Sequence, residues 1–140
     1  MAKDPAIPAG SLRVVVVTPE TTLVDDTATF VALPLFDGEI GIAPLHSPMI
    51  GRLGFGEMRI VQGNDERRLY VDGGFVQVVD NVVSVLTNRA VDVRDLNAAT
   101  AEEQLRSAGS MKANTDELLA IRDRSVAQAR GQLRAARRAR

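Results

Sequence analysis

Cysteine is absent from the 140 residues, which excludes disulfides, thiolate metal ligands and cysteine nucleophiles. The absence fits a reducing compartment, with the cytosol as the default. Long apolar runs are missing too: the longest are residues 14–17 and 31–36, and Pro34 interrupts the second. Neither approaches the length that spans a bilayer. We therefore expect a soluble or peripheral protein, with residues 1–11 as a flexible leader that lacks the apolar region of a secretory signal.

Catalytic residue combinations are scarce. His46 is the only histidine and lies between two prolines, so we interpret it as an ordinary loop residue rather than a general base. Paired acids at 25–26 and 102–103 fall at turn and helix-start positions, where solvated carboxylates are common. The glycine string at 51–56 precedes no helix that could receive a phosphate. The sequence therefore predicts a protein that is not an enzyme and has no metal site.

Charge is distributed unevenly along the chain, although the net charge is only -1. Residues 1–113 contain ten Lys and Arg against fifteen Asp and Glu, whereas residues 114–140 contain seven arginines against three acids. A basic segment suggests nucleic acid as a partner. The acidic body, the aromatic content of 4% and the lack of a recognised binding motif argue against it. We expect a protein partner instead.

From residue 12 to about residue 87 the chain consists of short β-branched runs separated by turn residues, which is typical of an antiparallel β-sandwich. Gly63–Asp65 and Asp80–Asn81 have the composition of hairpin turns. Pro34 marks an edge, a bulge or the end of a strand, because proline cannot donate a ladder hydrogen bond. The expected strands lie at 12–18, 27–36, 57–62 and 67–71, with two more flanking residues 80–81.

The pattern becomes helical near residue 95, so we divide the chain into a β-domain, 12–94, and a helical hairpin, 95–140. The first helix is expected at 96–108, capped by Asp95 or Asn97, with Gly109 as the left-handed residue that ends it. The second is expected from Thr115 almost to the C-terminus. Its apolar stripe at residues 119, 126 and 133 is narrow and suits one neighbouring helix. Two helices joined by a short polar linker predict an antiparallel hairpin that is held only weakly on the β-domain.

Two glycine-containing segments carry the most information. Residues 37–48 read DGEIGIAPLHSP, in which glycines alternate with apolar residues before two prolines. Residues 71–78 read VDGGFVQV, in which paired glycines interrupt a strand and indicate a bulge or a close backbone approach. In motif, order and spacing, the chain resembles the epsilon subunit of F-type ATP synthases over about residues 12–140.

The resemblance implies a ten-stranded β-sandwich followed by a two-helix hairpin. It also implies a non-catalytic rotor subunit of the central stalk in a proton-translocating synthase, bound to the gamma subunit and to the c-ring. Such a subunit lies at the cytoplasmic face of the inner membrane and associates with it only through the complex. On this chain the implied c-ring contact is formed by Asp37, Gly38, Glu39, Ile40 and His46, with Glu39 as the best single candidate. The alternative for Glu39 is a solvated turn carboxylate.

The resemblance also implies that the hairpin is an arm that leaves the sandwich and restrains ATP hydrolysis by binding the α/β catalytic subunits. The basic residues that would do so are Arg122, Arg124, Arg130, Arg134 and Arg137, with Arg138 as a possible addition. The alternative is a solvated basic face that interacts with the helix dipole.

Some members of this family bind ATP through a motif at the first helix that reads aliphatic-Asp-x-x-Arg-Ala. Here Asn97 replaces the aspartate and Thr100 replaces the arginine. Loss of the cation removes a charge-assisted hydrogen bond worth about 1.5–3 kcal/mol. We expect no ATP binding, or only weak binding, and no other cofactor. The main alternative to the whole assignment is a generic β-sandwich binding module with a helical tail for protein interactions.

Overall fold

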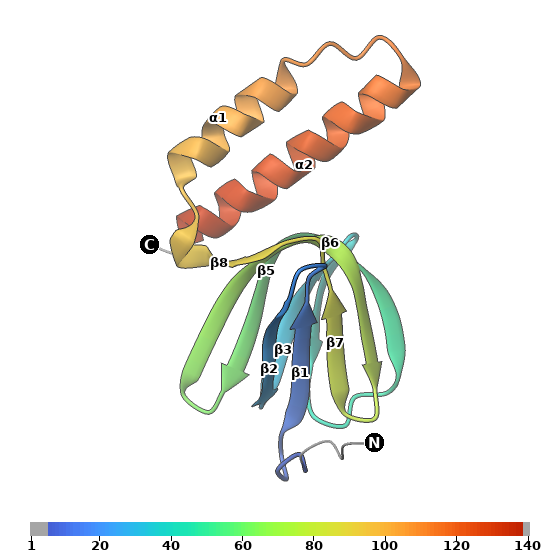
Figure 1. Ribbon diagram of the computed structural model, residues 1–140, viewed down its shortest axis with the longest axis vertical. Coiled ribbons are helices and arrows are strands. Elements are labelled where there is room, and N and C mark those ends of the chain that lie inside the picture. The colour runs from blue at the N-terminus through green and yellow to red at the C-terminus, as the bar shows by residue number, and fades with distance from the viewer. Residues whose placement is uncertain (1–5, 139–140) are drawn as a thin grey trace.

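The structure is a computed structural model that describes residues 6–138. Its strands form a curled sheet, and a helical hairpin lies across one end of that sheet (Figure 1). The elements are β1 (Leu12–Val17), β2 (Thr22–Ala28), β3 (Phe30–Leu35), β4 (Gly38–Ile42), β5 (Met49–Gln62), β6 (Asp65–Val79), β7 (Val82–Leu86), β8 (Ala90–Asp92), η1 (Val93–Asp95), α1 (Ala98–Gly109) and α2 (Asp116–Arg138). The prediction of a β-sandwich followed by a helical hairpin is confirmed.

The described residues contain eight strands rather than about ten, in the order β2-β1-β7-β6-β5-β3-β4, with β8 also paired to β6. The difference arises because β5 and β6 are 14 and 15 residues long, so each takes the place of two ordinary strands. Pairing between them is interrupted between Leu53↔Gly74 and Phe55↔Asp72. The pairs are antiparallel except β1 with β7, which run parallel.

The core lies inside the curled sheet and is built by alternation along the strands. In β1, Leu12, Val14 and Val16 are buried while the residues between them are partly exposed. These side chains belong to one apolar cluster with buried residues of β2, β3, β4, β5, β6 and β7. The sandwich therefore has a core of its own that does not depend on the helices.

The turn predictions follow local chemistry and are confirmed. Gly63 adopts a positive φ of 61° between β5 and β6, and Asp80 and Asn81 adopt φ values of 51° and 65° between β6 and β7. The pairing of β3 with β5 shifts register between Ala32 and Leu35, so Pro34 lies at the predicted irregularity. Gly74 has φ of 107°, and a Cβ there would lie 1.9 Å from the Leu86 carbonyl oxygen. Only glycine permits this approach of β6 to β7.

The helix ends confirm part of the prediction and correct part of it. Asn97 caps α1, because its side-chain oxygen accepts hydrogen bonds from the N–H groups of Ala99 and Thr100. Thr115 caps α2 by accepting from the Leu118 N–H at 3.1 Å. The prediction that Gly109 ends α1 in a left-handed conformation is wrong. Gly109 is the last residue of α1, and Ser110 forms its C-cap with φ of -91°.

The apolar stripe of α2 is buried only in its second half. Ala129, Leu133 and Ala136 are buried, whereas Leu119 is exposed. Figure 1 shows α1 and α2 antiparallel, with only one end of the hairpin near the sandwich. An ion pair of 2.8 Å between Arg137 and Glu102 joins the two helices close to that end. The helices therefore pack mainly on each other, and a short part of α2 holds them to the sheet.

Candidate functional site

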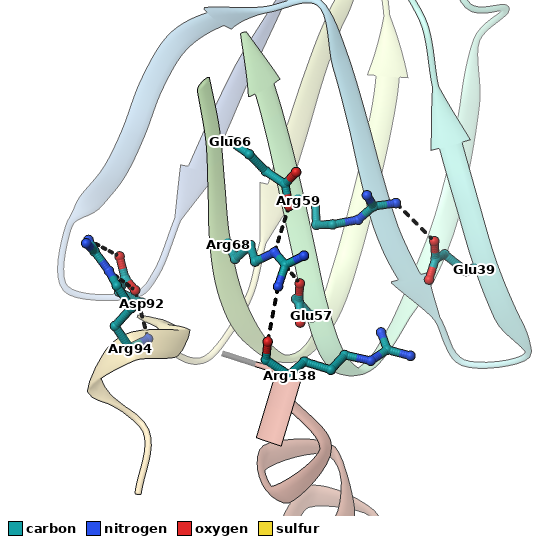
Figure 2. Close-up of polar contacts among 8 residues, drawn as sticks. All are labelled: Glu39, Glu57, Arg59, Glu66, Arg68, Asp92, Arg94 and Arg138. Carbon is teal, nitrogen blue, oxygen red and sulfur yellow. Dashed lines mark hydrogen bonds and ion pairs between the residues drawn. The ribbon is translucent and has the colours of Figure 1, made fainter. Parts of the chain in front are cut away.

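The loop implied to contact the c-ring is a turn between β3 and β4. Asp37 and Gly38 are exposed, and Ile40 is partly buried against the core. Glu39 is at the start of β4, its side chain is 60% exposed, and Arg59 Nη2 lies 3.8 Å from its Oε1 (Figure 2). An ion pair this long and this exposed contributes about 1 kcal/mol at most. Glu39 is thus available to a partner.

His46 lies apart from Glu39, beyond the other end of β4. Its Nδ1 lies 2.7 Å from the Ser47 carbonyl oxygen, and the neighbouring Leu45 N–H donates to Asn81 Oδ1 in the β6–β7 turn. The structure therefore brings Asp37, Gly38 and Glu39 together but places His46 near a different turn. Glu39 and His46 therefore lie toward opposite ends of β4.

The five arginines expected on the arm divide into two groups. Arg122 lies 3.7 Å from Asp123 and Arg137 lies 2.8 Å from Glu102, so both have carboxylate partners within the hairpin. Arg124, Arg130 and Arg134 are exposed and form no ion pair with any residue in the range 6–138. These three line a groove between α2 and the sandwich. Among the five, these are the arginines that lie in the groove without a carboxylate partner in the described part of the chain.

A polar contact and a close backbone approach hold α2 on the sheet. Gln128 Nε2 donates to both carboxylate oxygens of Asp72, at 3.0 and 3.2 Å. The Tyr70 hydroxyl also donates to Asp72, and burial together with this carboxylate raises the pKa of Tyr70, so the hydroxyl stays protonated. Gly131 lies against Phe55, since a Cβ at residue 131 would be 2.5 Å from the Phe55 carbonyl oxygen.

Arg68 ties the C-terminal end of α2 to the sheet (Figure 2). Its Nε lies 2.6 Å from Glu66 Oε1 and 3.3 Å from Glu57 Oε1, and its Nη1 donates to the Arg138 carbonyl oxygen at 3.3 Å. The Glu57 side chain is only 7% exposed, and its Oε2 has no hydrogen-bond partner among the described residues. The guanidinium therefore joins two strands to a helix carbonyl that has no partner within the helix.

Sequence reasoning missed this docking contact, although one signal was present. A glycine inside a helix costs about 1 kcal/mol relative to alanine, so Gly131 indicates close packing at that position. Asp72, Gln128 and Arg68 carry no comparable local signal, because their partners are distant in the sequence.

The altered nucleotide motif lies at the start of α1. The Asn97 side chain is occupied by the helix cap, and Thr100 is exposed. Among residues 6–138, no group of three or more His, Asp or Glu side chains is placed to hold a metal ion. In the same part of the chain, no helix is long and apolar enough to cross a bilayer.

Comparison with known proteins identifies the family. Residues 11–93 match the family model described as ATP synthase, Delta/Epsilon chain, beta-sandwich domain. The ATP synthase epsilon chain of Rhodopirellula baltica is 51% identical over 127 residues, which cover 91% of this chain and 99% of the relative. The chain belongs to the ATP synthase epsilon chain family. ATP synthase epsilon chain 2 of Ralstonia nicotianae supports the same assignment. It is 38% identical over 92% of this chain and 95% of the relative.

Solved structures share the epsilon-chain fold. A chain in the Euglena gracilis mitochondrial ATP synthase, in a structure of OSCP, F1 and c-ring, has a TM-score of 0.81 at 19% identity and covers 96% of this chain and 85% of its own length. A chain in the Tetrahymena thermophila mitochondrial ATP synthase central stalk and c-ring has a TM-score of 0.73 at 15% identity, over 89% of this chain and 95% of its own. Both helices are therefore part of the shared fold, although the family model covers the sandwich alone.

Proposed function

We propose that this epsilon chain is a non-catalytic rotor subunit of a proton-translocating ATP synthase, coupling c-ring rotation to ATP synthesis through gamma and the c-ring. The observation that carries the proposal is 51% identity to the Rhodopirellula baltica epsilon chain, across 91% of this chain and 99% of that relative. The subunit would lie at the cytoplasmic face of the inner membrane and associate with it through the complex.

For the gamma contact we assign the exposed apolar residues Leu45, Ile50 and Val79. Ile50 and Val79 lie on the same face of β5 and β6, because Ile50 pairs with Gln77 and alternate residues share a face. Leu45 joins this end of the sandwich through its hydrogen bond to Asn81. Exposed apolar side chains gathered in one area are typical of protein interfaces.

For the c-ring contact we assign the turn Asp37–Gly38–Glu39, with Glu39 as the orienting carboxylate. Glu39→Arg should weaken assembly with the c-ring about tenfold, because charge reversal replaces an attraction by a repulsion. A tenfold change corresponds to about 1.4 kcal/mol of binding free energy. Membrane-bound complex and proton-driven ATP synthesis are the quantities to measure. Asp65→Arg, a reversal of an exposed acid at the start of β6, is the matched control. Assembly and synthesis equal to the control would remove Glu39 from this role.

For regulation we propose that the hairpin is an arm that restrains ATP hydrolysis when it leaves the sandwich and its arginines meet the α/β subunits. The short contact that holds α2 supports this proposal, since a small docking free energy leaves both positions accessible. We propose further that ATP does not set the position of the arm, because Asn97 caps α1 and Thr100 lacks a positive charge. Equilibrium dialysis giving micromolar ATP affinity would disprove that part.

A further inference from the structure

A groove of about 1560 Å³ runs between α2 and the part of the sandwich where the pairing of β5 with β6 is interrupted. One wall is a face of α2, formed by residues that follow one another at intervals of three or four positions. The other wall is formed by β5, β6 and the segments that flank them. We propose that this groove binds an acidic, amphipathic segment of a partner protein while the hairpin is docked. The inference goes beyond the rotor role and does not depend on it.

The charges in the groove favour an acidic ligand. Arg124, Arg130 and Arg134 line it and have no carboxylate partner in the described part of the chain. Five arginines line the groove against three acids. Of these acids, Glu57 contacts Arg68, Asp72 accepts from Gln128, and Glu39 is only weakly paired with Arg59 at 3.8 Å. The net charge of the groove lining is therefore positive. Carboxylates of a ligand would form charge-assisted hydrogen bonds with these guanidinium groups.

The opposite wall carries exposed apolar surface. Phe36, Phe75 and Leu86 are 66%, 59% and 54% exposed, and Phe75 pairs directly with Leu86 across β6 and β7. The Arg52 guanidinium lies 5.8 Å from the centre of the Phe36 ring, a cation–π distance. A ligand with charge alone would leave these side chains in water. A segment with acids on one face and apolar residues on the other satisfies both walls.

Size and composition distinguish this ligand from others. Small-molecule pockets are usually about 300–1,000 Å³, so a groove of about 1560 Å³ suits a polypeptide segment better. A nucleic acid strand carries a phosphate at every nucleotide, whereas a peptide can present its acids to the three arginines and its apolar residues to Phe36, Phe75 and Leu86.

Binding in this groove would also act on the hairpin. Arg124, Arg130 and Arg134 belong to α2, whereas the apolar wall belongs to the sandwich, so the complete groove exists only when α2 is docked. A ligand that binds the docked state better than the undocked state shifts the population toward docking. The partner segment would therefore hold the arm down.

The test uses the full chain and a fluorescein-labelled synthetic peptide of Glu and Leu, about 15–20 residues long, designed as an amphipathic helix. Fluorescence anisotropy should show saturable binding that weakens with salt. The double variant Arg130→Glu, Arg134→Glu should bind about tenfold more weakly or worse, and so should Phe75→Ser. Arg106→Glu, a reversal of an exposed arginine on α1 outside the groove, should bind like the unaltered chain.

One more measurement and two more ligands complete the test. Hydrogen exchange of the α2 amides should slow when the peptide is added. An oligothymidylate of similar length and a Lys and Leu peptide should bind more weakly than the acidic peptide. The proposal is overturned by no saturable binding, by equal binding of the groove variants and Arg106→Glu, by tighter binding of the oligothymidylate, or by unchanged exchange in α2. Circular dichroism should show that each variant is folded before its binding is compared.

Discussion

Gly131→Leu should release the helical hairpin from the sandwich without unfolding either part. A Cβ at this position would lie 2.5 Å from the Phe55 carbonyl oxygen, and a backbone oxygen in a sheet cannot move aside. Leucine is a better helix former than glycine by about 1 kcal/mol, so α2 itself is not weakened. Overpacking of this kind typically costs 1–3 kcal/mol, which lowers the ratio of docked to undocked hairpin by roughly five- to 150-fold.

Hydrogen exchange measures this release directly. Amides in the second half of α2 should lose protection in Gly131→Leu, while amides of β1 and β6 keep theirs, because the sandwich core does not include the helices. Gly109→Leu is the matched control, since a Cβ at that helical glycine meets nothing within 4 Å. Arg68→Ala, which removes one tie to the Arg138 carbonyl, should cause a smaller loss. Equal protection in Gly131→Leu and Gly109→Leu would show that the contact with Phe55 does not hold α2.

Deletion of residues 110–140 should raise ATP hydrolysis by the assembled complex roughly fivefold or more. A fivefold change corresponds to about 1 kcal/mol, the lower end of ordinary coupling free energies. The deletion removes α2 and every arginine proposed to reach the α/β subunits, so the restraint is lost. Coupling between hydrolysis and proton pumping should stay intact, because the sandwich keeps its own core and its contact surfaces.

Gly131→Leu provides the opposite change in the same assay. If the released arm is the inhibitory one, this variant should hydrolyse ATP more slowly than Gly109→Leu, whereas the deletion hydrolyses it faster. Hydrolysis that is unchanged by both the deletion and Gly131→Leu would contradict the inhibitory arm. It would leave the rotor role untouched, because that role rests on the sandwich.

Features determined by neighbouring residues could be predicted from the sequence. The turns at Gly63 and at Asp80–Asn81 need positive φ values that Gly, Asn and Asp tolerate, and Asn97 and Thr115 cap helices through amides two or three residues away. The register irregularity at Pro34 follows because proline has no backbone N–H to donate to the neighbouring strand. Each feature depends on a few consecutive residues, so a pattern is enough to find it.

Features determined by distant residues could not be predicted. The continuity of β5 and β6 reduces the number of strands to eight, although each run contains glycines that suggest a break. The site shows the same limit: Arg137 is paired with Glu102, 35 residues away, so no local pattern separates it from the other arginines of α2. The position of the segment around His46 beside the β6–β7 turn involves the hydrogen bond from Leu45 to Asn81, 36 residues away.

The most direct test of the rotor assignment is complex formation with the gamma subunit of the same ATP synthase. The full chain and gamma, purified separately and mixed, should elute together from size-exclusion chromatography as a stable complex. Ile50→Asp should weaken that complex, because it places a charge in the exposed apolar area assigned to gamma. Separate elution of the unaltered chain and gamma would contradict the assignment.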